Sequence, residues 1–217
     1  MKKISCLLAF TLAISFAFAQ KSTRLNGYAN YVFDDSYSSL YDSYNYYNGT
    51  INGGVQWGVG FEFMLQPTVC LELMWLNQAT HAPTTYQTGP GTSVKNENFD
   101  LSINYAMLGA DKHMPLPNGK SELYGGIFAG VAFMNLKAPS SGRSSSAEKF
   151  AWQMRFGFIY WAAAKVGIKL QAQLTSIAQG AGGGFYFGTG GVGAGVSTYS
   201  SMYQFGLGGG LTFKVGH

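Results

Sequence analysis

Residues 150–158 read Phe-Ala-Trp-Gln-Met-Arg-Phe-Gly-Phe, with a large apolar side chain at every second position. The positions between them hold Ala, Gln, Arg and Gly. Successive side chains of a β-strand point to opposite faces of a sheet. The stretch therefore predicts a strand with one apolar face and one face of small or polar residues.

The same alternation recurs along the chain and indicates eight strands. Their expected ranges are 24–33, 53–64, 69–77, 99–110, 121–136, 150–161, 166–174 and 201–215. Three of the connections are short turns, at 66–68, 115–119 and 162–164. The other four are long and polar or glycine-rich, at 34–50, 78–98, 139–147 and 176–200.

The facing of one strand is assigned from its apolar parity, and that of another stays open. In the segment 99–110 we expect an outward apolar face and an inward polar one. The outward set is Phe99, Leu101, Ile103, Tyr105 and Met107, and the inward set is Asp100, Ser102 and Asn104. Glycine and aromatic residues occupy both parities of 121–136, so its facing is not assigned.

The second face of most strands carries Gly, Ala, Gln and Asn with few charges. In a soluble sandwich this face would be wet and rich in Lys, Glu and Thr. The strands are near the ~9–11 residues that a tilted strand needs to cross a bilayer, where an open sheet edge is not tolerated. The sequence predicts an all-β fold: an eight-stranded antiparallel transmembrane β-barrel with long extracellular loops and short periplasmic turns.

The N-terminal segment has the features of an export signal. Lys2 and Lys3 precede an apolar run from Leu7 to Phe18, and residues 17–19 form a small-x-small cleavage site. We expect a signal peptide at 1–19 and a single barrel domain at 20–217. Cys70 is then the one remaining cysteine, so no disulfide within the chain is expected.

Composition excludes some partners. Charged residues make up 11% of the chain, against about 25% in ordinary globular domains. The formal net charge is +4, and two of these charges belong to the expected signal peptide. So small an excess does not indicate a nucleic-acid partner.

The expected signal peptide, the eight alternating segments and the last strand, Tyr-Gln-Phe-Gly-Leu-Gly-Gly-Gly-Leu-Thr-Phe-Lys at 203–214, resemble a known family. They are similar to the small OmpA/OmpX-type outer-membrane β-barrels of Gram-negative bacteria, often named the porin family or outer membrane protein beta-barrel domain. The resemblance implies residence in the outer membrane, contact with its lipid, and insertion by the barrel-assembly machinery. The last strand carries the assembly signal in that family, and here its aromatic residue, Phe213, lies four positions before the end.

Strand parity assigns side chains to the two sides of the barrel wall. We expect a lipid-facing set comprising Trp57, Phe61, Leu73, Trp152, Phe156, Ile168, Leu170, Phe205 and Phe213. We expect a charge network in the lumen comprising Glu62, Glu72, Arg155, Lys169 and Lys214. Buried charges are costly unless opposite signs pair, so this network is interpreted as a plug, with a conductive path as the alternative.

The first long connection is rich in tyrosine, which suits adaptable binding loops because tyrosine offers a large amphipathic surface at low entropic cost. The binding candidates are Tyr37, Tyr41, Tyr44, Tyr46 and Tyr47. The alternative interpretation is that several of them join an aromatic girdle at the membrane interface. The extracellular ligand is not identified.

No motif predicts catalysis or a cofactor. Gly188, Gly190 and Gly193 match G-x-G-x-x-G, but the expected context is a loop and then a transmembrane strand. His81, His113 and His217 are expected on both sides of the membrane, so they do not form one metal site or triad. We therefore expect no catalytic residues, no metal and no cofactor.

The leading hypothesis is a non-enzymatic outer-membrane protein with an envelope-structural or surface-binding role through its extracellular loops. A small-solute porin or channel is the alternative. A lipid-modifying outer-membrane enzyme is a more remote one, for which His81 near Thr80 and Thr84 is the sole candidate.

Overall fold

The computed structural model describes residues 23–42, 45–178, 184–188, 191–195 and 202–215. Within these ranges all regular secondary structure is β-strand, and no helix is long and apolar enough to span a membrane. The first six strands are β1 (Thr23–Val32), β2 (Asp35–Asp42), β3 (Asn45–Ile51), β4 (Gly54–Gln66), β5 (Val69–Thr88) and β6 (Lys95–Pro115). The others are β7 (Ser121–Lys137), β8 (Ser144–Trp161), β9 (Val166–Ala178), β10 (Gly184–Gly188), β11 (Gly191–Gly195) and β12 (Met202–Val215).

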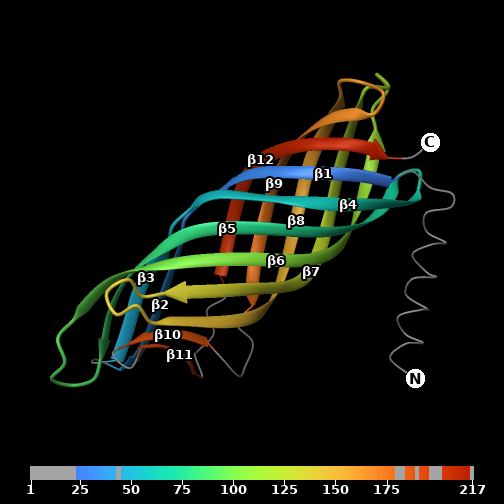
Figure 1. The fold of residues 1–217 in the computed structure, drawn as a ribbon. Helices are drawn as coiled ribbons and strands as arrows, with labels where there is room; N and C mark the ends of the chain where they lie inside the picture. Colours follow the sequence, from blue (N-terminus) through green and yellow to red (C-terminus); the bar gives the residue numbers. More distant parts are fainter. Residues whose placement is uncertain (1–22, 43–44, 179–183, 189–190, 196–201, 216–217) are drawn as a thin grey trace, which may run out of the picture.

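Eight of these strands form a closed antiparallel ring (Figure 1). Its order is β1, β4, β5, β6, β7, β8, β9 and β12, and the ring closes where Thr23 of β1 pairs with Val215 of β12. Closure leaves no sheet edge in the wall, so every wall strand has a hydrogen-bonding neighbour on each side. The expected eight-stranded barrel is confirmed.

The two ends of the barrel differ (Figure 1). The turns β4–β5, β6–β7 and β8–β9 lie at one end, hereafter the turn end, together with the described chain ends Thr23 and Val215. The opposite end, hereafter the hairpin end, carries the extensions of β5 to β8 and the hairpins β2–β3 and β10–β11. The two kinds of connection therefore segregate as expected.

The long connections contain more strand than the sequence indicated. The range 34–50 forms most of the β2–β3 hairpin, and β3 pairs with the far part of β5. The range 78–98 continues β5 and β6 and leaves only a turn at 89–94, while the range 139–147 includes the start of β8. The range 176–200 includes the hairpin β10–β11. These extensions have no lipid-facing apolar parity, so the alternation that reveals membrane strands does not reveal them.

The facing expected for the fourth sequence strand, now part of β6, is wrong. Ile103, Tyr105 and Met107 are buried inside the barrel together with Phe99 and Leu101. Asp100, Ser102 and Asn104 point outward, and Asp100 is exposed. The reason is that this half of β6 lines an apolar part of the interior while its outer face lies beyond the apolar belt. For β7, whose facing was open, Tyr124 and Phe128 point inward and Ile127 and Val131 point outward.

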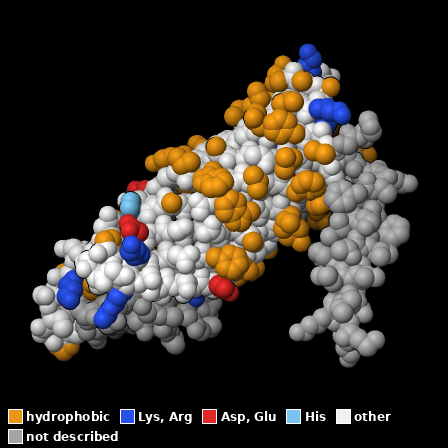
Figure 2. All heavy atoms as spheres, viewed as in Figure 1, with side chains coloured by type: hydrophobic (Ala, Val, Ile, Leu, Met, Phe, Trp, Pro, Cys, Tyr) orange, Lys and Arg blue, Asp and Glu red, His pale blue; other side chains and the backbone are white. Residues whose placement is uncertain are grey.

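Large exposed apolar side chains cover the outside of the turn-end half of the barrel (Figure 2). On β8 the belt follows the outward parity from Phe150 to Tyr160, about the 9–11 residues that a tilted strand needs to cross a bilayer. Histidine and charged side chains of both signs lie near the hairpin end, and further Lys or Arg side chains lie at the turn end, beyond the belt (Figure 2). Exposed apolar area of this extent is stable in lipid and would be an aggregation hazard in water.

The interior is packed. Apolar side chains of β5, β6 and β7 form the main core cluster, with Met74, Leu76, Tyr105 and Met107 nearly inaccessible to solvent. Across the lumen, β9 and its neighbours present amides, including Gln171 and Gln173. Closer to the turn end than these apolar and amide side chains, the interior holds a group of buried charged side chains.

Candidate functional site: the charged lumen of the barrel

Eight ionisable side chains gather inside the turn-end half of the barrel. This set, the lumen network, consists of Arg24, Glu62, Glu72, Asp111, His113, Glu122, Arg155 and Lys169, all buried. They come from seven different strands of the ring, so the network ties together positions that are far apart in sequence.

Arg155 lies at the centre of the network. Its guanidinium donates hydrogen bonds to both Glu72 and Asp111, including one from Nε to Asp111 Oδ1 at 3.0 Å. Nη1 donates to the hydroxyl of Tyr28 at 2.9 Å, and the guanidinium lies 4.4 Å from the centre of the Phe128 ring. Arginine suits this position because its planar fork satisfies two carboxylates at once while its flat face stacks on aromatic rings.

Lys169 forms a second centre next to the first. Its ammonium donates to Glu62 Oε1 at 2.8 Å and lies 4.5 Å from the centre of the Tyr124 ring. The amide of Asn26 donates to the same Oε1 at 2.7 Å and also reaches Glu72 at 3.2 Å. Asn26 thus joins the two ion-pair centres, and neither buried cation lacks an anionic partner.

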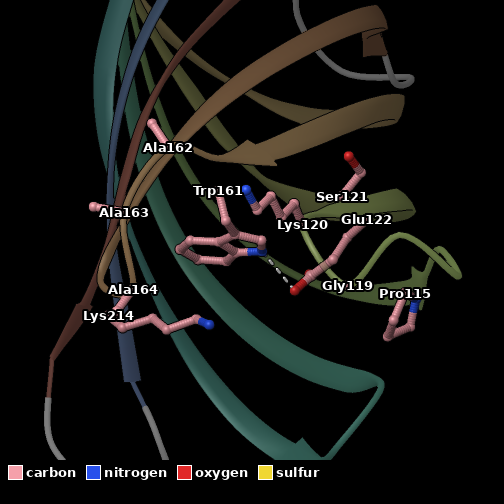
Figure 3. Close-up of a pocket in the computed structure, with 10 residues that line it drawn as sticks. All are labelled: Pro115, Gly119, Lys120, Ser121, Glu122, Trp161, Ala162, Ala163, Ala164 and Lys214. Carbon is pink, nitrogen blue, oxygen red and sulfur yellow. Dashed lines mark hydrogen bonds between the residues drawn. The ribbon is translucent and has the colours of Figure 1, made fainter.

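Arg24, His113 and Glu122 form the part of the network closest to the turn end. Arg24 pairs with Glu122 at 3.0 Å, and His113 Nδ1 lies 3.2 Å from the same carboxylate oxygen. Trp161 donates its indole N–H to Glu122 at 2.8 Å (Figure 3). Glu122 therefore accepts hydrogen bonds from three side chains.

A cavity of about 350 Å³ opens beside Glu122 at the turn end (Figure 3). Trp161 and Lys214 share its lining with the turn residues Gly119 and Ala163. Lys214 was expected in the charge network, but it forms no ion pair among the described residues. Its ammonium lies 3.9 Å from the centre of the Trp161 ring instead. Lys214 lies outside the ion pairs because it is near the end of β12, where the interior of the barrel opens at the turn end.

A layer of amides lies beyond the charges, toward the hairpin end. Tyr124 donates to Gln171 at 2.8 Å, Gln171 donates to Asn30 at 3.0 Å, and Gln173 donates to Gln56 at 2.7 Å. Gln153 donates to Gln173 at 3.3 Å. These hydrogen bonds link β1, β4, β7, β8 and β9 across the lumen, so side chains occupy the cross-section above the ion pairs as well.

Glycines make room for the network at two points. A Cβ on Gly60 would collide with the Glu72 carboxylate and would lie 2.9 Å from the Tyr28 ring. A Cβ on Gly157 would lie 2.5 Å from the Tyr124 ring. The alternation predicts that these glycines lie on the inner face, but it does not predict that Gly60 faces Tyr28 or that Gly157 faces Tyr124.

The nine side chains expected to face lipid all lie on the outward parity of their strands. Trp57, Leu73, Phe156, Ile168, Leu170, Phe205 and Phe213 are exposed, and Phe61 and Trp152 are half-buried. Trp57 on β4 makes an edge contact with Trp75 on the neighbouring strand β5. Trp152 on β8 makes an edge contact with Tyr203 on β12, across the intervening strand β9.

The tyrosine-rich segment forms the β2–β3 hairpin rather than an irregular loop. Tyr37 is half-buried and its hydroxyl bonds to the hydroxyl of Thr84 on β5. Tyr46 is also half-buried and lies in β3. Tyr41 and Tyr47 lie in β2 and β3, and Tyr44 lies outside the described residues. The hairpin projects beyond the apolar belt as a tyrosine-bearing surface attached to β5.

His81 lies on the outer wall near the hairpin end. Its Nδ1 is 3.1 Å from Asp100 Oδ1, and both side chains are more than half exposed. A shallow cavity beside them also has Ser102 and Lys137 in its lining. Among the described residues no hydroxyl is hydrogen-bonded to His81.

The G-x-G-x-x-G match falls on the second hairpin. Gly188 ends β10 and Gly193 lies in β11, while Gly190 and the terminal His217 lie outside the described residues. A strand follows the first glycine where a nucleotide fold would have a helix. The hairpin therefore has the wrong geometry for a phosphate cradle.

Sequence reasoning placed Glu62, Glu72, Arg155 and Lys169 on the inner parity, and the structure brings these four together. It missed Arg24, Asp111, His113 and Glu122. Asp111 and His113 lie beyond the expected end of that strand at residue 110, and in β6 they share the inward parity of Met107. Glu122 belongs to β7, for which the sequence did not predict the facing. Arg24, at the start of the first expected strand, was not assigned to either face.

The fold is similar to that of solved bacterial proteins, including the following two. The crystal structure of Neisserial surface protein A is 11% identical with a TM-score of 0.56, covering 88% of this chain and 97% of that chain. The outer membrane protein OprG from Pseudomonas aeruginosa is 13% identical with a TM-score of 0.58, covering 91% and 97%. No protein-family model matches the chain, and no curated protein sequence matches it. The fold is therefore that of small outer-membrane β-barrel proteins, as the sequence predicted.

Proposed function

We propose that this chain is an integral outer-membrane protein that fills its own lumen and acts through the region beyond the membrane. The observation that carries the proposal is the continuous filling of the interior. The lumen network fills the turn-end part of the interior, and the apolar cluster and the amide layer face each other across the part nearer the hairpin end. Eight strands leave an interior only wide enough for side chains, and here buried side chains occupy it.

The surface role is supported by the hairpin end. The β2–β3 hairpin and the far parts of β5 to β8 extend past the apolar belt and carry polar outward residues. Loops and hairpins on a rigid scaffold are where binding residues concentrate. A half-buried Tyr37 fixed to Thr84 provides the kind of ordered aromatic surface that binds with little entropic cost. The ligand class is left open.

The proposal is for a non-enzymatic role. It is supported by the exposure of the His81–Asp100 pair, because both side chains are more than half exposed and lie in a shallow cavity rather than in an enclosed site. Membrane lipid is the partner that the apolar belt supports. Insertion by the barrel-assembly machinery remains a prediction from the family resemblance.

The orientation can be tested by surface labelling. Short epitope tags inserted at Thr92, in the turn after β5, and at Ser141, in the turn after β7, should bind antibody on intact cells. A tag at Asn118, in a turn at the other end, should bind antibody only after the outer membrane is permeabilised. Equal labelling of Asn118 and Thr92 on intact cells would contradict the orientation, and with it the surface role.

A further inference from the structure

Three potential metal ligands meet inside the turn-end half of the barrel, each from a different strand. They are Glu62 on β4, Cys70 on β5 and His113 on β6, all buried. His113 Nε2 lies 3.6 Å from Cys70 Sγ and 3.8 Å from Glu62 Oε2. One ligand atom from each residue lies within 4.8 Å of the other two.

These distances are close to those of a tetrahedral zinc site. Zinc binds sulfur at about 2.3 Å and nitrogen or oxygen at about 2.0–2.2 Å, which places neighbouring ligand atoms roughly 3.3–3.6 Å apart. The observed separations of 3.6 and 3.8 Å need only small side-chain shifts. A thiolate, an imidazole and a carboxylate form a borderline-soft donor set that suits zinc better than magnesium or calcium.

One donor in this set lacks a hydrogen bond. Glu62 Oε1 accepts from Lys169 at 2.8 Å and from Asn26 at 2.7 Å, whereas Oε2 has no hydrogen-bond partner and makes only longer contacts, among them the ion pair with Arg24 Nε at 3.9 Å. The Glu62 side chain is fully buried, so an unmatched carboxylate oxygen is expensive there. Oε2 is the oxygen that lies toward His113 and Cys70, where a cation would satisfy it.

Glu122 orients His113 as an outer partner orients a metal-ligating histidine. His113 Nδ1 lies 3.2 Å from Glu122 Oε2; in the tautomer that carries its proton on Nδ1, this proton faces the carboxylate and the Nε2 lone pair faces Cys70. Carboxylate–histidine–zinc arrangements of this kind fix the tautomer and raise the basicity of the ligand. Arg24 Nη1 also lies 3.3 Å from Nδ1 and donates to the same Glu122 oxygen at 3.0 Å.

The carboxylates of the lumen network outnumber its permanently charged cations by one. Its carboxylates are Glu62, Glu72, Asp111 and Glu122, and its permanent cations are Arg24, Arg155 and Lys169. With neutral His113 the set carries one excess negative charge. A zinc ion bound to a deprotonated Cys70 adds one net positive charge and balances it, with the thiol proton released to solvent.

The turn-end cavity approaches the ligand set through Glu122. Glu122 lines this cavity (Figure 3), and its Oε2 lies 3.2 Å from His113 Nδ1. A carboxylate that contacts the imidazole therefore faces the mouth of the barrel.

We propose that Glu62, Cys70 and His113 bind a zinc ion inside the barrel, with Glu122 as a positioning residue and Asp111 beside the fourth position. Asp111 Oδ2 lies 4.0 Å from Cys70 Sγ. The ion would join β4, β5 and β6 at the level where the ion pairs join the other strands.

Cobalt(II) is the direct probe, because a thiolate ligand gives it a near-ultraviolet charge-transfer band and tetrahedral geometry gives it visible d–d bands. The full chain, exported and purified from membranes without an affinity tag, should show both after titration with Co²⁺, and Zn²⁺ should abolish them. Cys70→Ser and His113→Gln should remove the charge-transfer band, and Glu122→Gln should weaken binding about 10–100-fold. His81→Gln is the matched control and should bind as the unaltered chain does.

Folding of each variant is checked by its heat-dependent gel mobility, and X-ray absorption at the zinc edge of the unaltered chain provides a test independent of any variant. One sulfur with nitrogen or oxygen neighbours is the expected shell. A shell without sulfur, the absence of Co²⁺ bands in the folded chain, or bands that persist in Cys70→Ser would overturn the site.

Discussion

Replacing Arg155 by methionine should lower the free energy of unfolding in lipid bilayers by about 3–5 kcal/mol, because it leaves two buried carboxylates without their cation. Arg155 bonds to Glu72 and Asp111, and all three side chains are shielded from solvent. Methionine approximates the length of the arginine stem, so the loss reports the charge rather than a cavity. Denaturant titration in vesicles, followed by tryptophan fluorescence or gel mobility, measures it.

Lys149→Met is the matched control for this variant. Lys149 lies on the same strand and the same parity as Arg155, but near the hairpin end and outside every described ion pair. Its replacement should change the stability by less than about 1 kcal/mol. Adding Glu72→Gln and Asp111→Asn to Arg155→Met should recover part of the loss. A loss for Arg155→Met no larger than that of Lys149→Met would show that the network does not stabilise the barrel.

Phe156→Arg should cost about 2–4 kcal/mol in bilayers, because it places a cation on the lipid face near the middle of the apolar belt. Phe156 is 62% exposed and points outward between Met154 and Phe158 on its parity. Its neighbour Arg155 points into the lumen, so the two faces of β8 differ by one residue. The same vesicle titration measures the loss.

Ser146→Arg provides the comparison on the same strand and the same face. Ser146 is exposed beyond the belt, opposite Asn135 of β7. Arginine there remains in water or at the interface and should be nearly neutral. Equal losses for Phe156→Arg and Ser146→Arg would mean that the belt is not the lipid-embedded surface.

The eight wall strands could be predicted because a membrane strand must place apolar residues on one face, and β8 and β9 do so cleanly. Apolar alternation gives the wrong facing, or no facing, where both faces of a strand are apolar or where the apolar face points into the barrel. Met107, Tyr105 and Ile103 form a continuous apolar parity, but they pack inside the barrel. The residues that reveal the facing are on the other parity, where Ala106 and Leu108 are exposed within the belt.

The extensions beyond the membrane could not be predicted for a related reason. Residues 78–88 and 95–98 lie in β5 and β6, but their outer faces are wet and their sequence resembles a polar loop. Their pairing depends on the register fixed by the apolar part of the same strands. Apolar alternation appears in the sequence only where the outer face of a strand contacts lipid. Where the outer face contacts water, the strand has no such alternation and cannot be recognised from it.

Four of the eight residues of the lumen network could be predicted from strand parity. The other four could be recognised only from the tertiary structure. Glu62, Glu72, Arg155 and Lys169 interrupt clean alternations, so their inward direction could be inferred. Asp111 and His113 become inward residues only after β6 has the correct facing. Their proximity to Cys70 and Glu62 depends on the registers of β5 against β4 and β6.

The central claim is that side chains close the lumen from end to end. Single-channel recording in planar bilayers tests it most directly, with the folded full chain and with the Arg155→Met, Glu72→Gln, Asp111→Asn variant. The account predicts no stable channel steps for the unaltered chain, because its ion pairs, amide layer and apolar cluster fill the cross-section. Stable, porin-sized steps from the unaltered chain would contradict the claim and favour the alternative function, a small-solute channel.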